Sequence, residues 1–175
     1  MIDLEKVICL DTETTGRDPR SAEILQLAIV RGDDKILFNE YVRPEYTSSW
    51  PGAERVHHIS PAMVANKPIL RDYSERLNEI FENAELIVSY NGLHYDLPII
   101  AKYGFEEVLR RPHDDVMLKF APIYGDWNDY YGSYRWKNLS VCADYYDYES
   151  SGQFHDALED VRATLWCWKK MRGDI

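Results

Sequence analysis

The feature that most constrains this chain is an apolar run that ends in two carboxylates and a glycine turn. Residues 7–10 read Val-Ile-Cys-Leu, and Asp11, Glu13 and Gly16 come shortly after them. A short apolar run of this kind is typical of a strand buried on both faces at the centre of an α/β sheet. Because side chains alternate along a strand, Asp11 and Glu13 point the same way while Thr12 points the other way.

Two neighbouring carboxylates on a buried strand repel each other and are costly to bury without a positive partner. Oxygen ligands on a rigid strand favour hard divalent ions, so the pair predicts a site for Mg²⁺ or Mn²⁺ rather than zinc. The alternative is an ordinary acidic pattern, because the chain has 30 acidic residues and repeats Asp-x-Glu at residues 3–5 and 147–149. We expect those two repeats to lie on the solvated surface.

Length and hydrophobic patterning predict a single α/β domain over residues 1–175. Hairpin connections make the first three strands antiparallel, and a strand reached through a helix pairs parallel, so the sheet is mixed. Residues 44–52 predict a loop, and residues 116–124 predict a short strand leading into a helix. Strands are expected at 6–13, 23–30, 35–42 and 85–90, and helices at 61–65, 70–83, 96–103, 139–146 and 156–171.

The charge balance limits the kind of partner. The chain carries 20 basic and 30 acidic residues, a net charge of −10. A protein that grips long nucleic acid by neutralising many phosphates is usually basic, so this chain is not expected to belong to that class. An acidic protein can still process the end of a nucleic acid when bound divalent ions and a few local cations supply the positive field.

The sequence indicates neither a membrane protein nor a secreted one. No apolar run approaches 18 residues and no charged-then-apolar leader is present, so we expect no transmembrane segment and no signal peptide. The three cysteines lack metal-type spacing and are typical of reduced core residues, which favours a cytoplasmic protein.

A third candidate carboxylate, Asp96, follows the predicted strand at 85–90. It closes the segment Asn91-Gly-Leu-His-Tyr-Asp96, and Pro98 comes two residues later. An aspartate just before a helix whose first turn contains a proline is also a routine helix N-cap. Asp96 is therefore either a site carboxylate or a capping residue.

The fourth carboxylate, Asp160, comes with a histidine five residues before it. Five residues turn a helix by about 140°. His155 and Asp160 can therefore converge only if His155 lies in the loop before the helix and folds back. The alternative is a capping Asp156, a surface His155 and a solvated Asp160. Against a solvated Asp160, its neighbours Val161 and Leu165 belong to the apolar stripe of the helix.

Together these residues resemble the DnaQ-like, or DEDDh, family of 3′-to-5′ exonucleases. The resemblance rests on three motifs in the family's order: Asp-x-Glu-Thr-Thr-Gly at 11–16, Asn-x-x-x-aromatic-Asp at 91–96 and His-x-Ala-x-x-Asp at 155–160. All five catalytic positions of the family are filled. The segment His58-Ile59-Ser60, followed by Met63 and Pro68, is similar to small stand-alone members such as exonuclease X.

The resemblance implies a ribonuclease H-like fold, with a five-stranded mixed sheet whose first three strands are antiparallel and with helices on both faces. It implies that Asp11, Glu13, Asp96 and Asp160 bind two Mg²⁺ or Mn²⁺ ions around the scissile phosphate. It further implies that His155 accepts a proton from the attacking water and that the product is a nucleoside 5′-monophosphate.

Family analogy also implies substrate contacts, each with a structural alternative. The first group, which could equally form a turn, is Thr14, Thr15 and Gly16. His57 or His58 could line the same pocket or belong to a loop between helices. Asn91 could touch the substrate or fix the loop before Asp96.

An aromatic insertion at residues 125–136 departs from the leanest family members. Its aromatic side chains are Trp127, Tyr130, Tyr131, Tyr134 and Trp136, with Arg135 and Lys137 beside them. Exposed aromatics can stack unpaired bases, and the two cations could meet phosphates. The alternative is that these side chains pack on their own domain or on a partner subunit.

The expected partners are the 3′ ends of single-stranded DNA or RNA, with DNA slightly favoured. An oligoribonuclease-like enzyme acting on short RNA is an alternative, and so is a proofreading or binding subunit of a polymerase assembly. The sequence leaves the oligomeric state open, a homodimer included.

Overall fold

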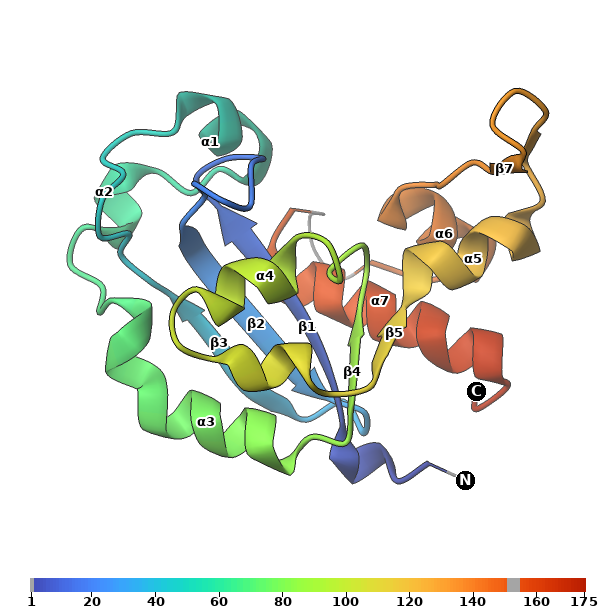
Figure 1. The fold of residues 1–175 in the computed structure, drawn as a ribbon, viewed down its shortest axis with the longest axis horizontal. Coiled ribbons are helices and arrows are strands. Elements are labelled where there is room, and N and C mark those ends of the chain that lie inside the picture. Colours follow the sequence, from blue (N-terminus) through green and yellow to red (C-terminus); the bar gives the residue numbers. More distant parts are fainter. Residues whose placement is uncertain (1, 151–154) are drawn as a thin grey trace.

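A computed structural model describes residues 2–150 and 155–175. At its centre is a five-stranded sheet of order β3-β2-β1-β4-β5 (Figure 1). The first three strands are antiparallel, and β4 and β5 run parallel to β1. This confirms the expected mixed sheet. The strands are β1 (Val7–Thr14), β2 (Ile24–Arg31), β3 (Ile36–Tyr41), β4 (Leu86–Ser89) and β5 (His113–Asp115).

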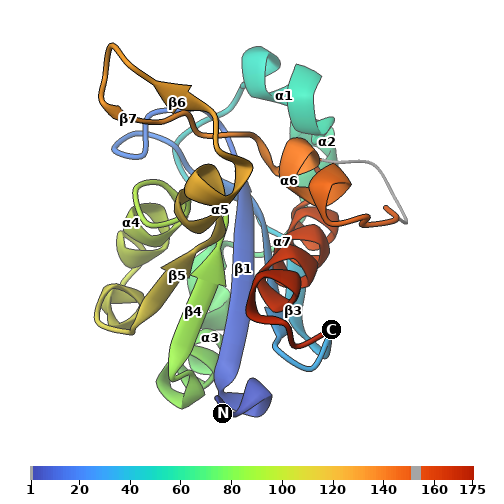
Figure 2. The same cartoon turned by 90° about the vertical axis from the view of Figure 1, so that its right-hand side faces the viewer.

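Helices cover both faces of this sheet, as expected. One hydrophobic cluster joins α3 and α4 to one face, and a second joins α5, α6 and α7 to the other (Figures 1 and 2). Within the described residues, no helix is long and apolar enough to cross a membrane. The α-helices are α1 (Pro51–His57), α2 (Pro61–Val64), α3 (Ser74–Asn83), α4 (Asp96–Ala101), α5 (Val116–Tyr124), α6 (Leu139–Tyr145) and α7 (Ala157–Arg172). Short 3-10 turns lie at Leu4–Lys6, Leu70–Tyr73 and Glu106–Leu109.

The central strand β1 divides its side chains between the two layers. Ile8 and Leu10 enter the cluster under α3 and α4, whereas Val7 and Cys9 enter the cluster under α7. Because this alternation has period two, the odd-numbered positions continue toward α7 beyond the apolar run. The strand therefore delivers its two carboxylates to the α7 side of the sheet.

The prediction of a strand at the start of residues 116–124 is wrong. The strand lies just before, in β5, and residues 116–124 are helical throughout as α5. The reason is the cap: the Asp115 carboxylate accepts hydrogen bonds from the backbone N–H groups of Met117 (3.1 Å) and Leu118 (3.4 Å). A side-chain acceptor at this position satisfies the free donors of a first helical turn and fixes where the helix begins.

The predicted loop at 44–52 also ends too late. Helix α1 begins at Pro51, where a proline is well suited to the first turn, and is capped after His57 by His58 in the left-handed conformation (φ 60°). Two further details differ from expectation. The helix predicted from residue 70 starts as a 3-10 turn, and the aromatic insertion forms a two-stranded hairpin of β6 (Trp127–Asn128) and β7 (Ser133–Tyr134).

Candidate active site

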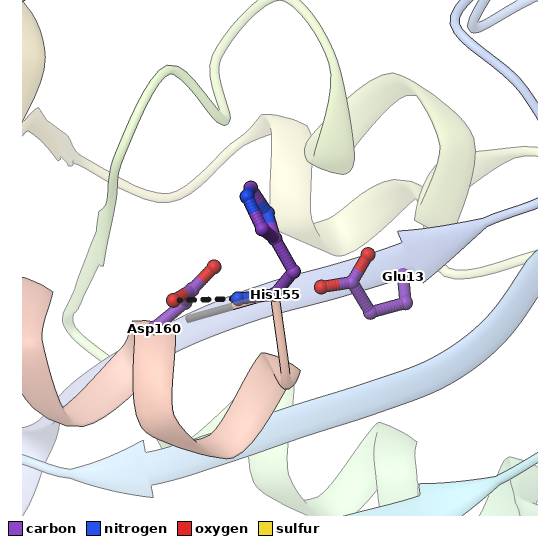
Figure 3. A group of neighbouring side chains, drawn as sticks. All are labelled: Glu13, His155 and Asp160. Atoms are coloured by element: carbon purple, nitrogen blue, oxygen red, sulfur yellow. Dashed lines mark hydrogen bonds between the residues drawn. The ribbon is translucent and has the colours of Figure 1, made fainter. Parts of the chain in front are cut away.

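Three of the predicted site residues meet beside the end of β1. Ligand atoms of Glu13, His155 and Asp160 all lie within 4.8 Å of one another. Figure 3 shows Glu13 projecting from β1 and Asp160 from the first turn of α7, with His155 in the loop that leads into this helix. Residues far apart in the sequence thus form one group that could hold a cation.

The start of α7 explains how His155 reaches Asp160. Asp156 caps the helix by accepting hydrogen bonds from the backbone N–H groups of Leu158 (3.1 Å) and Glu159 (3.3 Å). His155 therefore precedes the helix, has a left-handed backbone (φ 73°) and donates its own N–H to Asp160 Oδ1 (3.4 Å). Its side chain is exposed.

A buried glutamine that the sequence analysis missed holds this helix start in place. Gln26 on β2 donates from Nε2 to Asp156 Oδ2 (3.3 Å) and accepts from the Ala157 N–H at Oε1 (3.3 Å). Gln26 is 2% exposed, which is unusual for a glutamine. An isolated glutamine within an apolar strand was the only sequence signal for it.

Asp96 reaches the same end of the sheet from the opposite layer. It is buried, and its Oδ1 accepts hydrogen bonds from the backbone N–H of Thr12 (3.1 Å) and from the Thr12 hydroxyl. It stands at the first position inside α4, where Tyr95 occupies the cap, so the alternative of a helix N-cap is wrong for Asp96. Thr12, which points away from Asp11 and Glu13, orients this carboxylate.

Gly92 packs closely against Ser89 and Asp96. A Cβ built on Gly92 would lie 2.2 Å from Ser89 Oγ and 3.2 Å from Asp96 Oδ2. The Gly92 N–H also donates to Ser89 Oγ (3.1 Å). Only a glycine therefore fits in the turn between β4 and α4.

Burial and mutual repulsion make the four carboxylates weak acids. Burial, together with the charges of Asp96 and Asp160, raises the pKa of Asp11 well above its usual value. Burial and the charge of Asp160 raise the pKa of Glu13 to about 9. Burial raises the pKa of Asp160 to about 7 and that of Asp96 to about 6, the latter opposed by the Thr12 hydrogen bonds.

This electrostatic pattern fits divalent cations. In the described part of the chain, none of the four carboxylates forms a salt bridge with a lysine or arginine. Carboxylate oxygens are the preferred ligands of Mg²⁺ and Mn²⁺, and a bound cation would favour their charged forms. The site therefore has the donor atoms that such ions require, and the ions would supply the positive charge that the carboxylates lack.

A pocket of about 510 Å³ opens next to Glu13. Its walls are the end of β1, the turn that follows it and helix α1. This volume is within the range typical of small-ligand pockets. The lining residues are Thr12, Glu13, Thr14, Thr15, Gly16, Arg17, Gly52, Ala53, Arg55, Val56, His57 and Tyr95.

Several of the predicted substrate residues line this pocket but also make structural hydrogen bonds. Thr14 Oγ1 lies 2.9 Å from the Gly16 carbonyl and 2.5 Å from the Tyr95 hydroxyl. Thr15 Oγ1 accepts from the backbone N–H of Glu23 (3.0 Å). These bonds shape the turn after β1.

Both ring nitrogens of His57 form hydrogen bonds. Nδ1 accepts from the backbone N–H of Ile59 (3.0 Å), so Nε2 is the nitrogen that donates to the Thr14 carbonyl (3.1 Å). Burial lowers the pKa of His57, which favours this neutral form. His57 thus ties helix α1 to the end of β1, and the pocket includes its ring as a wall.

His58 and Asn91 are not among the residues that line the pocket in the described chain. His58 is exposed and closes helix α1. Asn91 is exposed with a left-handed backbone (φ 62°), and its N–H donates to Asp115 Oδ1 (3.1 Å). That bond is in line with the structural alternative for Asn91, the fixing of the loop before Asp96.

The aromatic hairpin of β6 and β7 rises at the same end of the sheet as α1 (Figures 1 and 2). Its tip residues Tyr130 and Tyr131 are 87% and 74% exposed, and Trp136 is 63% exposed. Trp127 and Tyr134 contact each other edge to face, with ring centroids 5.0 Å apart. Packing on the chain's own core therefore does not account for the two tip tyrosines, while base stacking and a partner surface remain as alternatives.

Comparison with known proteins agrees with this geometry. Residues 8–166 match the exonuclease family (RNase T). DNA polymerase III subunit epsilon of Rickettsia conorii is 32% identical over 95% of this chain and 73% of its own length. The subunit of the same name from Haemophilus influenzae is 26% identical over 99% of this chain and 70% of its own length.

Solved structures share the fold. Exonuclease I of E. coli, solved with a dA16 oligonucleotide, superposes with a TM-score of 0.74 at 20% identity over 96% of this chain. The chain spans only 41% of that protein's length. Since the family match extends over both β1 and the first turn of α7, it includes the segments that carry Glu13 and Asp160. The chain therefore belongs to the exonuclease family, in the DnaQ-like group of the ribonuclease H-like superfamily, and is a 3′-to-5′ exonuclease.

Proposed function

We propose that this enzyme removes nucleotides one at a time from the 3′ end of single-stranded nucleic acid, DNA in preference to RNA, and releases nucleoside 5′-monophosphates. The observation that carries the proposal is the convergence of Glu13, His155 and Asp160 beside a pocket large enough for one nucleotide. Asp11 and Asp96 lie close enough for their charges to interact with each other and with this group. The oligonucleotide bound to exonuclease I in its solved complex supports the choice of substrate.

The carboxylates and the histidine have different roles. Asp11, Glu13, Asp96 and Asp160 would hold two Mg²⁺ or Mn²⁺ ions, which would stabilise negative charge on the phosphate and make a water more acidic. His155, exposed at the edge of the cluster, would accept the proton of the attacking water. The pocket would hold the terminal nucleotide so that the scissile phosphate lies over the carboxylates.

The test follows oligonucleotides labelled at the 5′ end, in Mg²⁺ or Mn²⁺ and with chelator, beside an Asp11→Ala variant. We expect a ladder that shortens from the 3′ end, lost with chelator and in the variant. The ratio of rates on DNA and RNA of equal length distinguishes this function from that of an oligoribonuclease-like enzyme. Failure to cleave either polymer in either metal would contradict the proposal.

A second candidate function is that of a proofreading subunit within a polymerase assembly. The observation in its favour is the similarity to two DNA polymerase III epsilon subunits. It predicts that added polymerase raises the exonuclease rate on a mismatched 3′ end, whereas a stand-alone enzyme shows the same rate with and without polymerase. In either case we place the enzyme in the cytoplasm, in agreement with three buried, free cysteines.

A further inference from the structure

The pocket beside the cluster contains two cations that the sequence analysis did not single out. Arg17 comes from the turn after β1, and Arg55 comes from helix α1. Glu13 lines the same pocket. One small cavity therefore combines a site carboxylate with two guanidinium groups.

These two arginines differ from many others in the chain. Arg31, Arg111 and Arg172 each form a salt bridge with an acidic side chain at 2.6–2.8 Å. In the described part of the chain, Arg17 and Arg55 form no salt bridge, and both are exposed. With a net charge of −10, unpaired cations next to the acidic cluster are the local positive field that an anionic substrate needs.

We infer that Arg17 and Arg55 are substrate-binding residues that hold the 3′-terminal nucleotide in this pocket. The inference rests on the proposed function. A guanidinium presents several donors in a planar fork that suits phosphate and other acceptor oxygens of a nucleotide. Ala53 and Val56 on α1 line the same pocket and offer an apolar surface to the base.

The position of the pocket defines which nucleotide the arginines bind. The released nucleotide lies on the 3′ side of the scissile bond, and a pocket of about 510 Å³ has room for one nucleotide rather than a strand. The arginines should therefore matter as much for a dinucleotide as for a long strand. Residues that bind the upstream strand should matter only for the long one.

The first experiment measures binding of thymidine 5′-monophosphate in Mg²⁺ by calorimetry, with wild type, Arg17→Gln and Arg55→Gln. We expect each variant to raise the Kd about tenfold, as loss of one hydrogen bond to a charged group does. Arg→Lys variants should recover part of the loss. The control is Lys35→Gln, which removes the same charge from an exposed turn between β2 and β3, at the opposite end of the sheet, and should change the Kd by less than twofold.

The second experiment compares steady-state cleavage of a dinucleotide and a 20-nucleotide DNA strand by the same proteins. We expect KM to rise about tenfold on both substrates in each arginine variant, with kcat within twofold of wild type. The inference is overturned if wild type does not bind the mononucleotide, if both arginine variants match Lys35→Gln, or if KM rises only for the long strand. Arginine-dependent binding without cleavage would support the inference and count against the proposed function alone.

Discussion

At the scale of single residues, the site depends on side chains that lie outside the proposed set of metal ligands. Thr12 orients Asp96 through its N–H and hydroxyl, and Gln26 holds the cap of α7 next to His155. Loss of residues that orient metal ligands typically reduces metal affinity or activity by roughly 10- to 100-fold. The geometry of the cluster therefore extends beyond the carboxylates and the histidine.

Gly92→Ala should destabilise the enzyme and displace Asp96. The added methyl group would lie 2.2 Å from Ser89 Oγ, so the turn before α4 must shift, at a cost of about 1–3 kcal/mol. Denaturant unfolding and cleavage rate measure the two effects. Gly52→Ala is the control for stability, because no neighbouring atom lies within 4 Å of its Cβ position and alanine favours the helix. Equal stability of the two variants would refute the steric argument.

Glu13→Gln should make the metal-free enzyme more stable while it abolishes activity. The substitution removes one charge from a cluster whose members raise one another's pKa, and it removes a proposed ligand. We expect a higher Tm in chelator at pH 7.5 and a loss of mononucleotide release greater than about 100-fold. A lower Tm in chelator would show that Glu13 has a stabilising partner instead.

At the scale of elements, a hydrogen-bonded side chain of α1 joins this helix to the end of β1. His57 bonds the Thr14 carbonyl and the Ile59 N–H, so His57→Ala leaves two buried backbone groups without these partners. Each such group costs about 1–3 kcal/mol. We expect His57→Ala to lower the free energy of unfolding by at least about 2 kcal/mol. The exposed neighbour provides the control: His58→Asn, which tolerates a positive φ, should change it by less than about 0.5 kcal/mol.

The exposure of the aromatic hairpin does not by itself distinguish base stacking from contact with a partner protein. Replacement of Tyr130 and Tyr131 by serine should leave the free energy of unfolding within about 0.5 kcal/mol of wild type, because both are highly exposed. Activity then separates the alternatives. Base stacking predicts a higher KM for a 20-nucleotide strand but not for a dinucleotide, while a partner surface predicts no change on either substrate.

At the scale of the whole molecule, the acidic cluster links stability to pH and to metal. The folded-state pKa values of Asp96, Asp160 and Glu13 are raised to about 6, 7 and 9, above unfolded values of about 4. Raised carboxyl pKa values contribute stability that is present below pH 4 and is lost as the pH rises through the folded values. In chelator, the Tm should therefore fall between pH 6.5 and pH 9.

Divalent ions should oppose this pH dependence. Mg²⁺ or Mn²⁺ favours the charged carboxylates, so the rise in Tm on addition of metal should be larger at pH 9 than at pH 6.5. Glu13→Gln should show a weaker fall of Tm with pH in chelator than wild type. A Tm in chelator that rises between these two pH values would contradict the linkage.

Local patterns were sufficient for much of the fold and for the choice of site residues. The apolar run at residues 7–10 and the hairpin signal at residues 32–34 predict the central strands, and these lie where expected. The three motifs single out Glu13, Asp96, His155 and Asp160. The predictions were wrong where a single contact decides the secondary structure of a segment. The Asp115 cap, which makes residues 116–124 helical, is an example. Apolar, β-branched residues alone fit either a strand or a buried helix.

The sequence by itself determined the strand alternation, the family motifs and the need for a cation beside paired carboxylates, because these follow from the period of a strand and from charge repulsion. Only the tertiary structure decided which distant residues complete the site. Thr12 meets Asp96 across 84 positions, and Gln26 meets Asp156 across 130. Arg17 and Arg55 share a pocket through the packing of α1 against the turn after β1. Such contacts depend on how the helices and loops pack against the sheet, and no local sequence pattern encodes that packing.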